Sequence, residues 1–407
     1  MEPFRRLMTA CATLRRRMDT QGAGHSGWGS GAESPRLRIC FYAAVKDRRL
    51  FDVVEFYRQD MRALRDLGHD VVCVNRPAGL RGRYDVFWVW WPTSGMPAVA
   101  WGRLRGRPVV LVTAISDRDT TASGMGSKRA AAKLAARLSL ATANLTLASS
   151  FDTAAGLAAY RVRRLRVARL GVDTAFYRPG DAQVGEPYVV TVSHLTPDNV
   201  SRKRILDVVR TAAVLRDRAI PCRFVIIGDD RQAGADLVRA EIARLAVPDL
   251  VSLTGRLEAE DKRRLIAGAR VYFQPTQYEA FGLAIAEAMA CGVRVLTTAV
   301  GAVPEVVAQT GTLLPSQAGP PEFASQLIAL MGRPAGSVAA RERVLEHFSY
   351  EARRRSVAAA LTMVRSPGAQ PAAARQGETE LRRVERGAGS ATANRLGART
   401  TRRRETR

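Results

Sequence analysis

Short apolar runs and segments with helical apolar spacing alternate along this chain of 407 residues, and the alternation occurs twice. A short apolar run predicts a buried strand, and apolar residues three and four apart predict a helix that covers a sheet. Alternating strands and helices favour parallel sheets with helices on both faces. Pro179-Gly180 marks a break between the two arrays. We therefore predict an α/β protein with two Rossmann-like, doubly wound domains that face a cleft.

The predicted elements set the domain boundaries. In the first array, strands are predicted at 37–42, 71–74, 84–90, 108–112 and 145–148, with helices at 51–67 and 128–143. In the second array, strands are predicted at 188–192, 223–228, 251–254, 271–275 and 293–296, with helices at 204–217, 239–245, 260–267, 283–290 and 350–364. The resulting division is a basic head at 1–36, domains at 37–180 and 181–349, a last helix at 350–364 and an Arg-rich tail at 365–407. The head and the tail lack an apolar period, and we expect both to be disordered.

The formal net charge of +25 is unevenly distributed. The excess of Lys and Arg lies in the first array and in the two ends of the chain. This asymmetry favours an anionic partner, which leaves a membrane surface, an acidic substrate and nucleic acid open. A biased, Arg-rich composition without any binding role explains the charge equally well.

Several features predict a cytoplasmic protein. No run of eighteen apolar residues is present to cross a membrane. Residues 1–38 contain Arg15-Arg16-Arg17 but no continuous apolar core of a secretory signal. The five cysteines form no Cys-x-x-Cys pair and most lie in apolar stretches, which favours buried, reduced thiols. We expect a cytoplasmic location, peripheral on the inner face of the membrane if the basic residues bind lipid.

Two carboxylates eight residues apart, Glu279 and Glu287, follow the predicted strand at 271–275. Glu279 falls in a strand-to-helix loop, and Glu287 lies about one turn inside the helix at 283–290. The backbone N–H groups at the start of such a helix, together with the positive end of its dipole, favour an anion. The arrangement predicts a site for a phosphorylated ligand, and the alternative is a pair of solvated acids on a helix surface.

The sequence that contains this segment resembles glycosyltransferase family 4, the retaining, metal-independent nucleotide-sugar enzymes with the two-domain GT-B fold. The resemblance runs from about residue 37 to residue 364 and is strongest from 188 to 315. It also rests on Gly171-Val172-Asp173, Ser201-Arg202-Lys203-Arg204, Ile227-Gly228-Asp229, Thr254-Gly255, Gly301-Ala302-Val303-Pro304-Glu305 and His347-Phe348-Ser349-Tyr350. It implies that the helix at 350–364 is the crossover helix of that fold.

The resemblance implies a role for each residue of the motif. Glu287 would accept hydrogen bonds from the ribose diol of the donor. Lys203 would neutralise the leaving diphosphate together with backbone donors. Glu279 would lie near the donor sugar, and Gly228 would let a phosphate or a base approach the end of its strand. The implied backbone donors are Phe281, Gly282 and Leu283.

Some positions depart from the family pattern. Where the family has an arginine after the first strand of the second domain, this chain has His194, which could donate a hydrogen bond and, when protonated, a charge. Arg202 or Arg204 could serve instead. In the first domain, residues 43–49 replace a glycine-rich loop and Asp117 lies where a histidine is often found. The acceptor side is therefore left open.

Asp117-Arg118-Asp119 has the Asp-x-Asp spacing of metal-dependent glycosyltransferases. That spacing is common by chance, and those enzymes use a different fold. The histidines show no zinc spacing either. We expect no metal site.

Tryptophans and arginines gather around the third predicted strand. They are Trp88, Trp90, Trp91, Trp101, Arg103, Arg105 and Arg107. Two interpretations remain open: an ordinary sheet core, or a basic-aromatic surface that meets a membrane or a lipid-linked acceptor.

The resemblance implies a retaining, metal-independent glycosyltransferase. It would move a sugar from a nucleotide-diphospho-sugar to a glycan, lipid-linked or small-molecule acceptor, with no cofactor besides the donor substrate. The catalytic candidates are Glu279, Lys203 and His194, and the donor-binding candidates are Glu287, Phe281, Gly282, Leu283, Gly228, Arg202 and Arg204. A nucleotide-sugar epimerase of the same fold is the alternative. A nucleic-acid-binding protein is less expected, because the basic ends form separate appendages rather than one stripe.

Overall fold

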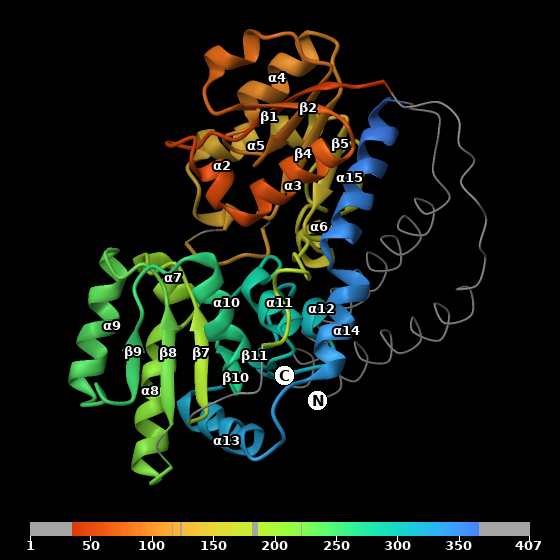
Figure 1. The fold of residues 1–407 in the computed structure, drawn as a ribbon. Helices are drawn as coiled ribbons and strands as arrows, with labels where there is room; N and C mark the ends of the chain where they lie inside the picture. The colour runs from red at the N-terminus through yellow and green to blue at the C-terminus, as the bar shows by residue number, and fades with distance from the viewer. Residues whose placement is uncertain (1–34, 116, 123, 181–185, 221, 366–407) are drawn as a thin grey trace, which may run out of the picture. The chain divides into compact units, whose positions relative to one another are not determined.

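Two sheets of six parallel strands each organise the protein (Figure 1). The computed structural model describes residues 35–115, 117–122, 124–180, 186–220 and 222–365. From Leu37 onward the described residues belong to one compact unit. The predicted disordered head and tail lie outside the described residues, apart from residues 35, 36 and 365 at their inner ends.

The first sheet has the strand order β2-β1-β3-β4-β5-β6. Its strands are β1 (Arg38–Tyr42), β2 (Asp70–Val74), β3 (Val86–Trp90), β4 (Val109–Thr113), β5 (Leu145–Ala148) and β6 (Leu165–Val167). One face packs against α2 (Leu50–Val53), α3 (Glu55–Asp66) and the last helix, α15 (Tyr350–Arg365). The other face packs against α4 (Met96–Leu104) and α5 (Ala130–Thr142). Every residue of β3 and β4 is buried, as expected for a parallel sheet covered on both sides.

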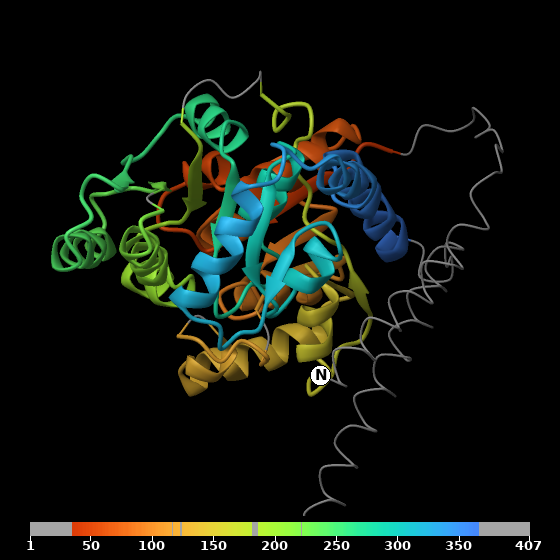
Figure 2. The ribbon, with the colours of Figure 1, turned by 90° about the horizontal axis from the view of Figure 1, so that it is seen from below.

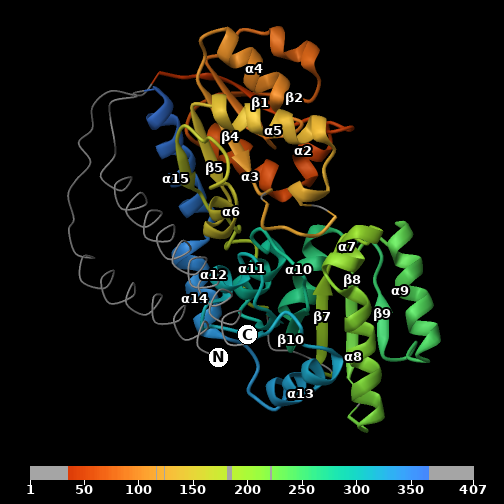
Figure 3. The same cartoon turned by 180° about the vertical axis from the view of Figure 1, so that it is seen from behind.

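The second sheet has the order β12-β11-β10-β7-β8-β9. Its strands are β7 (Tyr188–Val192), β8 (Arg223–Ile227), β9 (Val251–Leu253), β10 (Val271–Gln274), β11 (Arg294–Thr298) and β12 (Thr312–Leu314). One face is covered by α8 (Ile205–Asp217), α9 (Ala233–Arg244) and α13 (Pro320–Met331). The other is covered by α10 (Ala259–Ala267), α11 (Leu283–Ala290), α12 (Val303–Val307) and α14 (Val338–His347), as Figure 2 and Figure 3 show from two further sides.

Each sheet reverses its winding direction at one point. In the second sheet, β7 pairs with β8 on one side and with β10 on the other. The chain therefore leaves β7 toward one face through α7 (Pro197–Arg202) and α8, and leaves β10 toward the opposite face through α11. In doubly wound sheets, ligands bind outside the carboxyl ends of the strands at such a switch point. The predicted doubly wound α/β architecture is confirmed.

Some predicted boundaries are wrong. The helix expected at 51–67 is two helices, α2 and α3, because Val54 between them has extended backbone angles (φ −81°, ψ 113°). The helix expected from Arg239 already begins at Ala233. The strands β6 and β12 and the six-residue helix α7 were not predicted. No residue of either strand is fully buried, so neither strand has the apolar run of a core strand.

The tryptophans of β3 form core rather than surface. Trp88 and Trp90 are fully buried, and the indole N–H of each donates to Oδ2 of Asp60 at 3.1 Å. The basic-aromatic surface interpretation is therefore wrong for these two residues. The physical reason is that they point toward the face that α3 and α15 cover.

A buried ion pair fastens the last helix to the first sheet. Arg353 of α15 donates from Nε to Oδ1 of Asp60 at 2.7 Å and from Nη2 to Oδ2 at 2.9 Å. Its Nη1 donates to the carbonyl of Ala168 at 2.6 Å. Both side chains are almost completely buried. Asp60 thus accepts from the guanidinium and from both indoles, and removing one partner would leave charge and donors uncompensated.

We expect Arg353→Met to lower the free energy of unfolding by about 3–5 kcal/mol, because Asp60 would stay buried without its cation. Arg354→Met is the matched control: Arg354 is the next residue and pairs at the surface with Glu351, so its loss should cost about 0.5 kcal/mol or less. Urea denaturation followed by tryptophan fluorescence measures both. Equal effects of the two substitutions would contradict the assignment.

Candidate functional site

Charged side chains from two adjacent strand ends meet at the switch point of the second sheet. Lys203 follows β7 and Glu279 follows β10, and the Lys203 Nζ lies 3.3 Å from Oε1 of Glu279. Arg202 Nη1 lies 3.4 Å from the same oxygen. Gln274, the last residue of β10, donates to it from Nε2 at 2.8 Å. The structure therefore brings together three of the predicted site residues.

Helix α7 holds these cations in place. Its N-cap, Thr196, accepts a hydrogen bond from the backbone N–H of Asn199, and Pro197 occupies the first turn. At its other end, the carbonyl of Arg202 accepts from the N–H of Gln277 at 2.7 Å. The guanidinium of Arg202 donates to the carbonyl of Tyr278 at 2.8 Å. The short helix is thus pinned directly to the loop that carries Glu279.

Burial and charge act against each other in this pair. The side chains of Lys203 and Glu279 are 13% and 11% exposed. Burial by itself would raise the pKa of Glu279, but the charges of Lys203 and Arg202 outweigh it and lower the pKa. Burial lowers the pKa of Lys203, and Glu279 opposes that shift. Glu279 is therefore held as a carboxylate at neutral pH and is unsuited to donate a proton.

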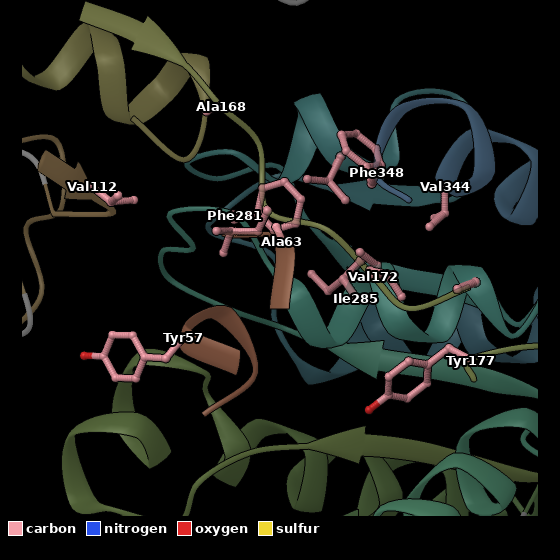
Figure 4. Close-up of a cluster of buried hydrophobic side chains, with 14 of the residues drawn as sticks. Tyr57, Ala63, Val112, Ala168, Val172, Tyr177, Phe281, Ile285, Val344 and Phe348 are labelled. Atoms are coloured by element: carbon pink, nitrogen blue, oxygen red, sulfur yellow. The ribbon is translucent and has the colours of Figure 1, made fainter. Parts of the chain in front are cut away.

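The start of α11 presents backbone donors. Gly282 caps the helix with φ +89°, a left-handed conformation that favours glycine. Among the described residues, none accepts a hydrogen bond from the backbone N–H of Phe281, Gly282 or Leu283. The ring of Phe281 is buried and packs edge-on against Phe348, with ring centroids 5.6 Å apart, and this contact anchors the turn (Figure 4). A helix start of this kind is suited to an anion.

Glu287 is held by a lysine that sequence reasoning missed. Glu287 is 3% exposed, and its Oε2 accepts from Nζ of Lys262 at 2.6 Å. The same ammonium donates to the hydroxyl of Tyr177 at 3.2 Å. Burial first, and then the charge of Glu287, raise the pKa of Tyr177, so its hydroxyl stays neutral. Lys262 lies in the run Glu260-Asp261-Lys262-Arg263-Arg264, which reads as a solvated helix surface.

His194 lies among positive charges. Its side chain reaches solvent, yet desolvation by the surrounding protein, followed by the charges of Lys203 and Lys262, lowers the pKa of His194. Asp229 opposes this shift. At neutral pH the imidazole is therefore uncharged: it can exchange hydrogen bonds, but it does not supply the cation that an arginine would.

Two predicted donor-binding residues have structural partners. Arg204 donates to Asp207 at 2.7 Å and to the carbonyl of Ala318 at 2.8 Å, so the structure does not bring its guanidinium to Glu279. A Cβ at Gly228 would lie 2.2 Å from the carbonyl oxygen of Ser193. The close approach of the β7 and β8 ends therefore requires glycine there, whether or not a ligand binds.

The Asp-x-Asp residues of the first domain are engaged separately. Asp117 accepts from the hydroxyl of Tyr160 at 2.8 Å. Asp119 accepts from the N–H of Thr121 at 2.9 Å, within its own loop. In the part of the chain that the structure describes, no group of His, Cys, Asp and Glu side chains is arranged to hold a metal ion.

The first domain contacts the loop that carries Glu279. Ser149 donates from Oγ to the carbonyl of Ala280 at 3.3 Å. The hydroxyl of Tyr278 donates to Oδ2 of Asp152 at 2.8 Å, at the start of α6 (Phe151–Gly156). The other oxygen of Asp152 lies 2.7 Å from Nε of Arg118. A cation from the first domain is thereby linked to the residue next to Glu279.

Comparison with known families identifies the second sheet. Residues 186–333 match the family described as Glycosyl transferases group 1. Over these residues, about a third of its length, the chain is similar to that family. The group 1 segment contains Glu279, Glu287, Lys203 and Lys262, so both acids and both lysines lie inside the matched region. The predicted family is confirmed, whereas the roles of the individual residues stay predictions.

Relatives of the group 1 segment carry glycosyltransferase names. The MMP alpha-(1->4)-mannosyltransferase of Mycolicibacterium hassiacum is 30% identical over 195 residues, which cover 48% of this chain and 44% of that protein. The alpha-maltose-1-phosphate synthase of Mycobacterium tuberculosis is 29% identical over 213 residues, which cover 46% and 53%. The chain thus spans about half the length of the curated relatives it matches.

Solved structures share the fold at low sequence identity. The sucrose-phosphate synthase of Thermosynechococcus elongatus superposes with a TM-score of 0.67 at 19% identity, covering 81% of this chain and 99% of that one. HepE of Anabaena, solved in complex with UDP and glucose, gives a TM-score of 0.61 at 18% identity and covers 80% and 100%. The predicted GT-B fold is confirmed.

The lowered pKa of His194 has a measurable consequence. Below its ordinary pKa of 6.5 the unfolded chain would bind a proton at this residue more readily than the folded chain. The contribution of the neutral imidazole is therefore present above pH 6.5 and is lost as pH falls through the folded pKa. We expect the NMR titration of His194, assigned with His194→Gln, to have its midpoint below 6.5. A midpoint above that value would show that Asp229 outweighs the lysines.

Proposed function

We propose that the chain transfers a sugar from a nucleotide-diphospho-sugar to an acceptor hydroxyl, with retention of anomeric configuration and without a metal ion. The observation that carries this proposal is the pairing of Glu279 with Lys203 beside the unpaired N–H groups at the start of α11. The match to group 1 glycosyl transferases supports it. So does a fold neighbour, HepE, which was solved in complex with UDP-glucose.

The donor's diphosphate would bind at the start of α11. Lys203 and the N–H groups of residues 281–283 provide positive charge and hydrogen-bond donors where the leaving group becomes more negative. Glu287, inside the same helix, would accept from the ribose hydroxyls. These fixed groups would stabilise the transition state more than the ground state, which is the condition for catalysis.

The proposed reaction needs no carboxylate nucleophile. The bond between the sugar C1 and the phosphate oxygen breaks as the acceptor oxygen bonds to C1 on the same face, and the acceptor proton passes to the leaving phosphate oxygen. Glu279 supports this route because its low pKa and its contacts with Lys203 and Gln274 make it a poor base. As an anion near the donor sugar, it would hold hydroxyls and stabilise positive charge on the ring.

The acceptor would reach the site from the first domain. We further propose that the first domain binds to an anionic membrane surface. Helices α4 and α5 pack against each other and contain no Asp or Glu. Leu104, Leu134 and Leu138 are 79%, 57% and 49% exposed on them. Among the described residues, the cations of α5 and of the segment before it have no ion-pair partner; they are Lys128, Arg129, Lys133 and Arg137.

Exposed leucines flanked by unpaired cations suit a lipid surface. The cations would contact anionic headgroups while the leucines enter the boundary with the acyl chains. Within the described residues, every helix is too short or too polar to span a bilayer. A peripheral position would place a lipid-linked acceptor within reach of the first domain.

The donor assignment predicts different defects for the two acids. With a panel of nucleotide sugars, we expect Glu279→Gln to lower turnover about a hundredfold, because the charge near the sugar is lost. We expect Glu287→Gln to weaken donor binding about tenfold, because a charged acceptor of hydrogen bonds is lost. Calorimetry measures binding, and release of nucleoside diphosphate measures turnover.

Glu346→Gln serves as the control, since Glu346 is 73% exposed at the end of α14. Unchanged donor affinity in Glu287→Gln would refute its assignment. Products formed without an acceptor decide the reaction class: free nucleoside diphosphate supports transfer or hydrolysis, whereas an epimerised nucleotide sugar would establish an epimerase.

The membrane assignment predicts binding to vesicles of phosphatidylglycerol and phosphatidylcholine but not to phosphatidylcholine alone. Replacing Lys133 and Arg137 together by Gln should weaken binding about tenfold or more, because each cation contributes about 1 kcal/mol. Leu134→Ser with Leu138→Ser should also weaken it. The control is Leu237→Ser on α9, a helix that covers the second sheet; the Leu237 side chain is 47% exposed. Sedimentation with vesicles measures binding, and equal binding by all variants would overturn the assignment.

A further inference from the structure

The diphosphate site described above has one fixed lysine and a neutral histidine. A nucleoside diphosphate brings a charge of about −2 or more into a largely buried region, and such charge is costly without compensation. Lys203 supplies one cation, but it is already paired with Glu279. Arg202 is committed to the carbonyl of Tyr278 and to Oδ1 of Asn199. A second available cation is therefore required.

Lys262 has the geometry of a prepared cation. Its Nζ donates to Glu287 at 2.6 Å and to the hydroxyl of Tyr177 at 3.2 Å. An ammonium group has three N–H donors, so one is left for a ligand. The side chain of Lys262 is 25% exposed, whereas that of Glu287 is 4% exposed. The ammonium thus retains access to solvent while two contacts fix its position.

The sheet topology brings Lys262 to the same edge as the other site residues. Lys262 lies in the first turn of α10, the helix that follows β9 in the chain. His194 and Lys203 follow the end of β7, and Glu279 follows the end of β10 in the same parallel sheet. The partner of Lys262, Glu287, lies in α11, the helix whose start carries the unpaired N–H groups.

The electrostatic field at His194 agrees with this placement. After desolvation, the groups that act on the pKa of His194 are Lys203, Lys262 and Arg256, which lower it, and Asp229, which raises it. The two lysines therefore act on one point, the position after β7. Arg256 also lowers the pKa of His194, but its side chain is exposed and no described contact holds it in place.

We propose that Lys262 supplies the second positive charge for the diphosphate of the donor, in place of a cation at position 194. In this assignment Glu287 and Tyr177 hold the ammonium in position before the donor arrives. The assignment rests on the proposed function, because it requires that the chain bind a nucleoside diphosphate.

Binding of UDP, GDP, ADP, CDP and dTDP, compared with the matching monophosphates, tests the proposal by calorimetry. The main variant is Lys262→Gln, whose amide can still donate to Glu287, so that the acid is not left without a partner. We expect it to weaken binding of the preferred diphosphate about tenfold or more and to affect the monophosphate much less. Lys262→Arg, which keeps the charge, should stay within a few-fold of the wild type.

A rescue experiment adds a second, independent readout. His194→Arg in the Lys262→Gln background should restore diphosphate binding, because it returns a cation to the position after β7. Arg264→Gln, two residues along α10 and exposed, is the control for a change of charge on the helix. Melting temperatures of all variants confirm that each is folded before its affinity is compared.

The outcomes separate the two proposals. If the wild type binds none of these nucleoside diphosphates, the proposed function fails. If the wild type binds and Lys262→Gln binds equally well, the role of Lys262 is refuted. Equal losses for monophosphate and diphosphate would show that Lys262 only positions Glu287 on the ribose. A larger loss in Arg256→Gln than in Lys262→Gln would assign the second charge to Arg256 and overturn the proposal.

Discussion

Two buried carboxylates must be neutralised before any ligand arrives, and this constraint shapes the carboxyl edge of the second sheet. A buried acid without a partner is costly, so Glu279 and Glu287 each require a cation. Lys203, from the β7 side of the switch point, neutralises Glu279, and Lys262 of α10 neutralises Glu287. The need to compensate the acids therefore fixes cations where a diphosphate would bind. Such prearranged charges need little rearrangement during a reaction.

Much of the fold could be predicted because parallel strands are buried on both faces. Their apolar runs are continuous, and the predicted strands agree with the observed ones to within a few residues, while the predicted helix 283–290 matches α11 fully. The misses have physical causes. The strands β6 and β12 lie at the sheet edges and are only partly buried, so they lack a continuous apolar run. The break at Val54 interrupts an apolar spacing that continues across it. The indoles of β3 are buried because Asp60 satisfies their N–H groups, a partner that the local sequence does not reveal.

The candidate site was predictable only where its residues follow adjacent strands. Lys203 and Glu279 lie in the segments that follow β7 and β10, which pair directly, and the helix α7 carries Lys203 to the loop of Glu279. Lys262 could not be found in this way, because it lies in a charged run and its partner Glu287 comes from a different helix. The motif containing Arg204 suggested a ligand role, but its guanidinium fastens the α8 start to the segment before α13. Sequence motifs thus predicted which residues form the candidate site, whereas only the packing shows which of their charges are paired with each other.

The first domain reaches the loop of Glu279 through contacts that the local sequence does not reveal either. These contacts are polar and join segments far apart in the chain, such as the link from Arg118 through Asp152 to Tyr278. Polar contacts between domains of one chain resemble transient interfaces more than a core. Because Tyr278 is the neighbour of Glu279, any movement of the first domain that breaks this link acts on the loop that carries the donor-side carboxylate. The position of the first domain and the geometry of the loop that carries Glu279 are thereby coupled through polar contacts, which include this hydroxyl group and the Oγ of Ser149.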